Sequence, residues 1–163
     1  MIGKDRAVSV SRRINAPQNV VFDVLADPAR HVELDGSGML RGAVNSTPIT
    51  RVGDVFVMKM HNARLGDYEM DNRVVEFEQD RRIAWEPAPG RGHPRAEGGR
   101  LGHRWSFELG SDGPGATIVT ESYDCSRAPE REREGMGNGG VWLDAMTATL
   151  ERLDGLCTGR AGD

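Results

Sequence analysis

The chain has 163 residues, a hydrophobic content of 37% and a charged content of 28%, which together predict one soluble globular domain over residues 1–163. Its net charge of −4 disfavours a nucleic-acid binder or a protein that docks on anionic membranes, because both need a basic face. The N-terminal segment has no apolar signal region, and no stretch approaches about 18 consecutive apolar residues. We therefore expect a cytoplasmic protein without integral membrane association.

A strand and two short helices are expected at the start of the chain. Apolar side chains recur at even spacing over residues 8–14, which is typical of a half-buried strand. Pro17 is suited to the start of a helix, because its missing N–H is not needed in the first turn. This helix ends before Pro28, since the residue before a proline is pushed out of the helical region. Residues 28–34 predict a second short helix.

Alternating apolar residues predict six further strands: residues 39–45, 54–61, 68–77, 81–86, 101–109 and 116–125. A change of phase within the third of these segments predicts a β-bulge near Asn72. Residues 87–102 are rich in Gly, Pro and Arg and predict a long exposed loop. Two phases compete in the last strand, so the sequence leaves open which way Glu121 and Tyr123 face.

A long amphipathic helix is expected near the C-terminus, ending near Leu156. Residues 127–134 are highly charged and predict a solvated linker, and the glycines within residues 135–140 predict a flexible hinge. The glycine spacing formally fits a dinucleotide motif, but no buried strand precedes it, so we expect no such cofactor. One apolar stripe runs along the helix: Trp142, Met146, Leu150 and Leu153.

Several short segments, in this order along the chain, carry a resemblance to one superfamily: residues 14–17 (Ile-Asn-Ala-Pro) with Val21, Phe22 and Leu25; 52–54 (Val-Gly-Asp); 83–86 (Ile-Ala-Trp-Glu); 105–107 (Trp-Ser-Phe) with 115–117 (Gly-Ala-Thr); and the final helix. They resemble the START-like (SRPBCC) superfamily, in particular its polyketide cyclase/dehydrase and lipid-transport-like branch. The resemblance implies an α+β helix-grip fold, in which a curved antiparallel sheet of about seven strands wraps around the long C-terminal helix. It also implies an apolar cavity between the sheet and the helix.

Apolar and aromatic side chains on the strand faces and the helix stripe are the candidate ligand-binding residues. They are Phe56, Met58, Met60, Tyr68, Trp85, His103, Trp105, Phe107, Tyr123, Trp142, Met146 and Leu150. Ligand pockets are usually lined by such groups, and methionine adapts to several ligand shapes. Spacing alone favours a solid core in which these side chains touch one another, whereas the fold resemblance favours a cavity.

His103 is the candidate catalytic residue. It lies in phase with Trp105 and Phe107 and is expected to face inward, where an imidazole can exchange a proton near neutral pH. Glu121, if it also faces inward, would form an acid–base pair with His103, and Tyr123 would supply a hydroxyl. The alternative is a hydrogen-bonded histidine of the core.

Other titratable residues give weaker signals. His31 and Asp35 lie four residues apart and either orient a ligand at the cavity mouth or serve a local cap or turn. His93 lies in the glycine-rich loop and is expected to be solvated. No histidine or cysteine has metal-ligand spacing, so no metal site is expected, and Cys125 and Cys157 are expected to be reduced.

The sequence and the resemblance together lead to a protein that binds a hydrophobic or aromatic small molecule, such as a lipid or a polyketide-like compound. The first alternative is a cyclase, aromatase or dehydratase that uses His103. The second is a co-chaperone-like interaction module. The ligand, the oligomeric state (a homodimer included) and a gating role for residues 35–38 and 89–99 stay open.

Overall fold

The computed structural model describes residues 6–99 and 101–159, which form an α+β fold. Seven antiparallel strands build a curved sheet in the order β1-β7-β6-β5-β4-β3-β2. The strands are β1 (Ala7–Ile14), β2 (Leu40–Ala43), β3 (Val55–Asn62), β4 (Gly66–Glu78), β5 (Arg82–Pro89), β6 (Arg104–Ser111) and β7 (Thr117–Asp124). The helices are α1 (Gln18–Leu25), the 3-10 turn η2 (Pro28–Arg30), α2 (His31–Leu34), α3 (Glu130–Gly135), the 3-10 segment η3 (Gly137–Trp142) and α4 (Leu143–Thr158).

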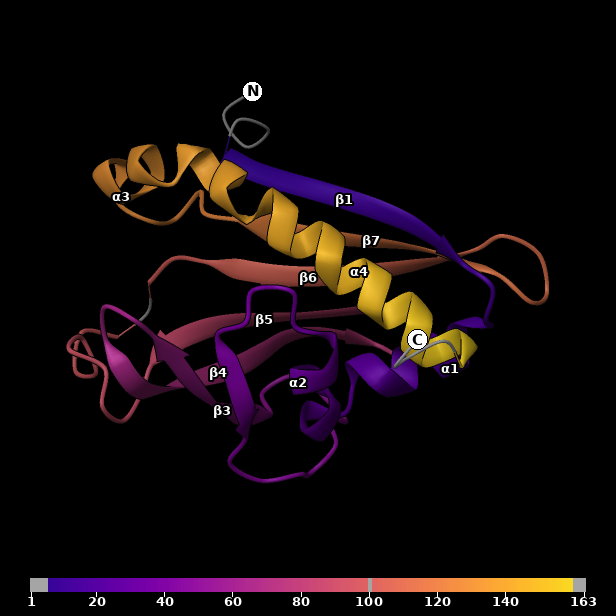
Figure 1. The fold of residues 1–163 in the computed structure, drawn as a ribbon, viewed down its shortest axis with the longest axis horizontal. Helices are drawn as coiled ribbons and strands as arrows, with labels where there is room; N and C mark the ends of the chain where they lie inside the picture. The colour runs from indigo at the N-terminus through magenta and orange to yellow at the C-terminus, as the bar shows by residue number, and fades with distance from the viewer. Residues whose placement is uncertain (1–5, 100, 160–163) are drawn as a thin grey trace.

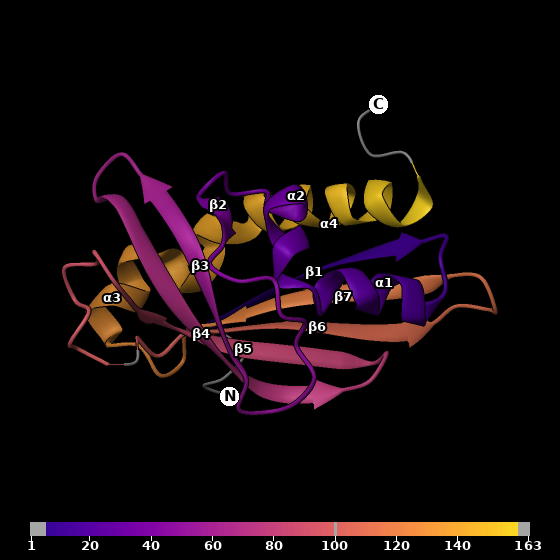
Figure 2. The ribbon, with the colours of Figure 1, turned by 90° about the horizontal axis from the view of Figure 1, so that it is seen from below.

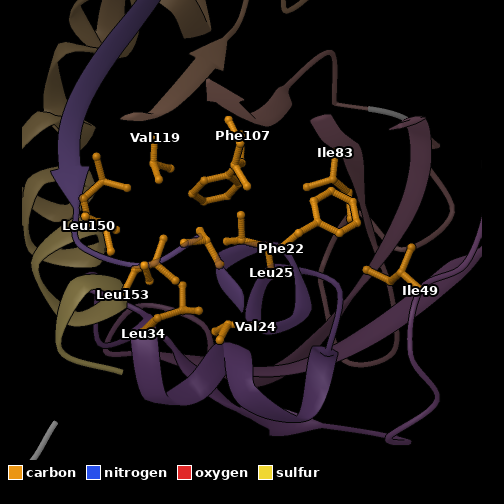
Figure 3. Packing of buried hydrophobic residues seen from close by; sticks show 14 of the residues in the cluster. Phe22, Val24, Leu25, Leu34, Ile49, Ile83, Phe107, Val119, Leu150 and Leu153 are labelled. Carbon is orange, nitrogen blue, oxygen red and sulfur yellow. The ribbon is translucent and has the colours of Figure 1, made fainter. Parts of the chain in front are cut away.

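The long helix α4 runs obliquely along one face of the sheet, and α1 and α2 lie on that same side (Figures 1 and 2). The expected helix-grip fold is therefore confirmed. A left-handed residue, Gly159, ends α4 with φ near 77°, a conformation that glycine adopts without a steric penalty. The side chains that hold the layers together converge between α1, α4 and the sheet, and Figure 3 shows them: Phe22, Leu25, Phe107, Val119, Leu150 and Leu153.

Strand β5 is longer than predicted and takes in Pro87 and Pro89, which the sequence placed in a loop. On one side, these residues pair with β4. On the other side, the pairing with β6 ends at Trp85, so the rest of β5 lies at an open edge. Proline is tolerated at such an edge, because no neighbouring strand needs its missing N–H.

The structure shows which side chains of β7 face α4, a question that the sequence left open. Val119, Glu121 and Tyr123 of β7 are buried on the face toward α4, whereas Thr120 alternates with them. The bulge in β4 lies between Val74 and Glu76, slightly beyond the predicted position near Asn72. Strand β6 begins at Arg104, so His103 lies just before the strand rather than within it.

The segment before α4 is more ordered than predicted. Residues 127–134 were expected to be a linker, but they include most of α3, whose described residues are not buried. The glycines of η3 do not behave as a simple hinge. Gly139 is buried with φ near 99°, and a Cβ atom there would lie 2.8 Å from the Tyr123 ring. Glycine at this position lets the chain cross directly over Tyr123.

Candidate functional site

A cavity of about 290 Å³ lies between the sheet, α2 and α4. Its walls combine aromatic, methionine and aliphatic side chains with a few polar groups, as in small-molecule sites. The lining residues are Leu25, His31, Leu34, Asp35, Ser37, Met39, Leu40, Phe56, Met58, Met60, Tyr68, Met70, Asn72, Trp85, Pro87, His93, Leu101, His103, Trp105, Phe107, Glu121, Tyr123, Trp142, Ala145, Met146 and Thr149. All three tryptophans of the sequence are among them.

The structure brings together eleven of the twelve candidate ligand-binding residues around this cavity. The exception is Leu150, which packs in the main hydrophobic core with Leu153 (Figure 3). Sequence reasoning missed several lining residues that continue a recognised strand phase, such as Met70 beyond Tyr68 and Pro87 beyond Trp85. On α2 and the following turn, His31 and Asp35 were considered from the sequence and line the cavity, whereas Leu34 and Ser37 were missed because the segment is too short to give a periodic signal.

Two groups of rings shape the cavity. One consists of Trp105, Tyr123 and Trp142 and is called the aromatic cluster below. The ring centroids of Trp105 and Tyr123 are 4.5 Å apart, and those of Trp105 and Trp142 are 5.8 Å apart. In the other group, His31 stacks on Trp85 at 5.4 Å, and Phe56 meets Trp85 edge-on at 5.2 Å. Flat, polarisable walls of this kind suit an aromatic or aliphatic ligand body.

Glu121 is the most unusual polar group of the site. The residue is 5% exposed, and its Oε1 atom is buried without a hydrogen-bond partner. Burial raises the pKa of this carboxyl to about 8, and the nearby charge of Asp35 adds to the effect. Glu121 is therefore mainly protonated at pH 7. A carboxyl group in this state both donates and accepts a hydrogen bond.

His103 and Tyr123 form a pair of titratable side chains in direct contact inside the cavity. The Tyr123 hydroxyl lies 2.9 Å from Nδ1 of His103, and it also approaches the Met136 sulfur at 3.6 Å. Burial lowers the pKa of His103 and raises that of Tyr123, so both are neutral at pH 7. His103 thus bonds to Tyr123 and not to Glu121, the partner considered from the sequence.

His31 is the first residue of α2 and is buried, with 4% of its surface exposed. Its Nε2 lies 2.7 Å from the Leu25 carbonyl oxygen and must donate to it, because a carbonyl only accepts. Burial lowers the pKa of His31, which keeps the ring neutral and leaves Nδ1 unprotonated. His31 therefore ties α2 to the end of α1 and presents an aromatic face to Trp85.

Both loops considered as gates contribute to the cavity wall. Asp35 holds the first in a turn: its carboxylate accepts from Ser37 N and Oγ (3.0 and 2.7 Å) and from Leu40 N (3.0 Å). This arrangement agrees with the turn role for Asp35. His93 in the second loop was expected to be solvated, but it packs edge-on against Tyr68, with ring centroids 5.4 Å apart, and lines the cavity.

Among residues 6–99 and 101–159, those that line the cavity include two acidic side chains, Asp35 and Glu121, and neither lysine nor arginine. The Trp142 indole N–H is a buried donor that makes no hydrogen bond of normal geometry. Within residues 6–99 and 101–159, His, Cys, Asp and Glu nowhere gather in threes that could hold a metal ion. Cys125 and Cys157 are both free thiols. The described helices include none with the length and apolar character needed to cross a membrane.

Comparison with solved structures identifies the architecture. The Mycobacterium smegmatis protein Ms6760 superimposes with a TM-score of 0.70 at 13% identity, covering 96% of this chain and 93% of that one. The Zhui aromatase/cyclase from a Streptomyces species gives a TM-score of 0.63 at 14% identity, covering 95% and 94%. The chain shares its helix-grip fold with these two proteins. At these identities the likeness concerns the fold, which hosts several kinds of activity.

A closer relative by sequence is the uncharacterized protein Rv0088 of Mycobacterium tuberculosis, which is 38% identical over 121 residues. The match covers 74% of this chain and 48% of Rv0088, so the chain spans about half the length of the curated relatives it matches. No family model matches the sequence.

Proposed function

We propose that this protein binds a hydrophobic or aromatic small molecule, lipid-like or polyketide-like, in the cavity between the sheet and α4. The observation that carries the proposal is the cavity itself, about 290 Å³ in volume and walled by rings and methionines. Apolar surface removed from water drives such binding, at roughly 25 cal/mol per Å² before ordering costs are subtracted. The fold neighbour named as an aromatase/cyclase supports a ligand of this class.

Tryptophan fluorescence tests this proposal directly, because Trp85, Trp105 and Trp142 all line the cavity. The neutral naphthalene dye prodan is a suitable probe, since its emission moves to shorter wavelength in apolar surroundings. We expect saturable binding, quenched tryptophan emission and a higher melting temperature in the presence of the dye. Saturable binding without any change in tryptophan emission would place the dye elsewhere and contradict the proposal.

A second candidate function is catalysis of a cyclisation, aromatisation or dehydration. It is favoured by the contact of 2.9 Å between His103 and Tyr123 inside the cavity. A neutral imidazole can take a proton from a bound poly-β-ketone chain, while the walls hold the chain in a reactive shape.

Replacing His103 with Gln tests the catalytic role. If the imidazole moves the proton, turnover of a poly-β-ketone substrate falls about 10²–10⁴-fold. Substrate affinity stays within about threefold, because glutamine keeps a polar group of similar size. His61→Gln is the matched control, since His61 is 41% exposed at the end of β3 and bonds to Asp67. Unchanged turnover in His103→Gln would remove His103 as the proton carrier.

A further inference from the structure

The described cavity wall can carry negative charge but little positive charge, because burial lowers the pKa of its three histidines, His31, His93 and His103. Glu121 and Asp35 are acidic, and no lining residue in the described part of the chain is a lysine or arginine. The neutral N–H of Trp142 adds a donor but no positive charge. The charge of Arg95 acts on His93 and His103, but this guanidinium is paired with Glu132. A ligand that carries a carboxylate or phosphate would meet two acidic groups and no lysine or arginine among the described lining residues. Such a wall disfavours anionic lipids and fatty acids.

The Oε1 atom of Glu121 is buried and makes no hydrogen bond to another group of the described protein. Asp35, by contrast, is satisfied within its own turn by Ser37 and Leu40. Burying a carboxyl group without a hydrogen bond costs stability, so an unsatisfied one in a binding cavity indicates a bound partner. The unpaired carboxyl oxygen can accept a hydrogen bond from a donor, and the neighbouring Asp35 charge favours a donor that is positively charged.

Aromatic faces lie next to Glu121. Tyr123 follows it two residues later on the same face of β7, and Phe107 is its register partner on β6. The Trp105 ring lies beside the Tyr123 ring at a tilt of 50°, with centroids 4.5 Å apart. A cation held within about 6 Å of such rings is stabilised by their negative faces. Carboxylates and rings together are the usual surroundings of a bound ammonium group.

We infer that the cavity takes a ligand with an apolar body and a protonated amine, and that the amine forms an ion pair with Glu121 beside the aromatic cluster. This inference rests on the proposed function and names its ligand class. On binding, the Glu121 carboxyl releases its proton to solvent, and the ammonium group replaces that proton as partner of the carboxylate. Among the described residues, Asp35 is the charged group that acts on Glu121. The titratable side chains His31, His103 and Tyr123 line the same cavity, and Arg152 of α4 donates to the Asp35 backbone carbonyl.

Three matched probes test the inference by calorimetry at pH 7: naphthylmethylamine, naphthylmethanol and naphthoic acid. We expect the amine to bind at least about tenfold more tightly than the alcohol, and the acid to bind most weakly. In Glu121→Gln the preference for the amine over the alcohol disappears. In the matched control Glu134→Gln, which alters an exposed residue of α3, the preference is kept.

Proton release gives a second readout that needs no variant. Titrations of the wild-type protein in two buffers of different ionisation enthalpy report protons exchanged on binding. We expect nearly one proton released per amine bound at pH 7, because Glu121 is mainly protonated beforehand, and none with the alcohol. An alcohol that binds as tightly as the amine, or an amine that binds without proton release, overturns the inference while leaving the proposed function intact. If none of the three probes binds, both the inference and the proposed function are contradicted.

Discussion

Gly36→Ala is expected to lower the stability of the protein by about 3 kcal/mol, which corresponds to a melting temperature lower by about 10 °C. The added Cβ atom would lie 2.2 Å from the Ala145 carbonyl oxygen and 2.7 Å from the Thr149 nitrogen, both in the backbone of α4. Backbone atoms cannot move aside as the end of a flexible side chain can. The turn after α2 must therefore separate from α4, at the cost of the hydrogen bond from Gly36 N to Thr149 Oγ1.

The same substitution is expected to weaken ligand binding, because the turn that holds Gly36 also carries Asp35 and Ser37 of the cavity wall. Urea unfolding and prodan binding measure the two effects separately. The matched control is Gly110→Ala in β6, where a Cβ atom would meet nothing within 4 Å. Equal stability of the Gly36→Ala and Gly110→Ala variants would show that α2 and α4 are not packed as closely as described.

Much of this arrangement follows from local sequence pattern. The even spacing of Phe56, Met58 and Met60 predicted the cavity face of β3, and the structure places all three on the cavity wall. The alternation from His103 to Phe107 likewise predicted an inward face. In these segments one face is clearly more apolar than the other, and the period of a strand then decides which side chains face inward.

Other features depend on pairing between distant segments and leave no local signal. Glu121 is polar and alternates with Thr120, so the sequence of β7 does not favour either face. Its inward direction is set by antiparallel pairing with β1 and β6. The extension of β5 through Pro87 depends on β6 ending its pairing at Trp85. His93 packs on Tyr68 only because the long loop folds back over β4.

Leu150 shows that an apolar stripe along a helix does not by itself predict which of its residues line a cavity. Met146 and Leu150 share one face of α4, yet Met146 lines the cavity and Leu150 packs in the core. The helix crosses the sheet obliquely (Figure 1), so the surface beneath one stripe changes along its length. The cavity therefore ends where α1 approaches α4 and its side chains fill the remaining space.

The position of Ala145 on the cavity wall permits a test of where the ligand binds. Ala145→Phe is expected to reduce prodan affinity by about 100-fold, or about 3 kcal/mol, because the new ring occupies ligand space. Folding stability should stay within about 1 kcal/mol or rise, since the ring fills a void without removing an existing contact of a larger side chain. Prodan titration and thermal unfolding measure the two quantities.

Thr147→Phe is the matched control for this variant, because Thr147 lies on the same helix but is exposed and does not line the cavity. It adds the same ring to α4 on the solvent side, and prodan affinity should not change. Unaltered affinity in Ala145→Phe, with the variant folded, would mean that the dye binds outside the cavity. A loss confined to Ala145→Phe would locate binding between α4 and the sheet, since the two variants differ mainly in the direction in which the ring projects.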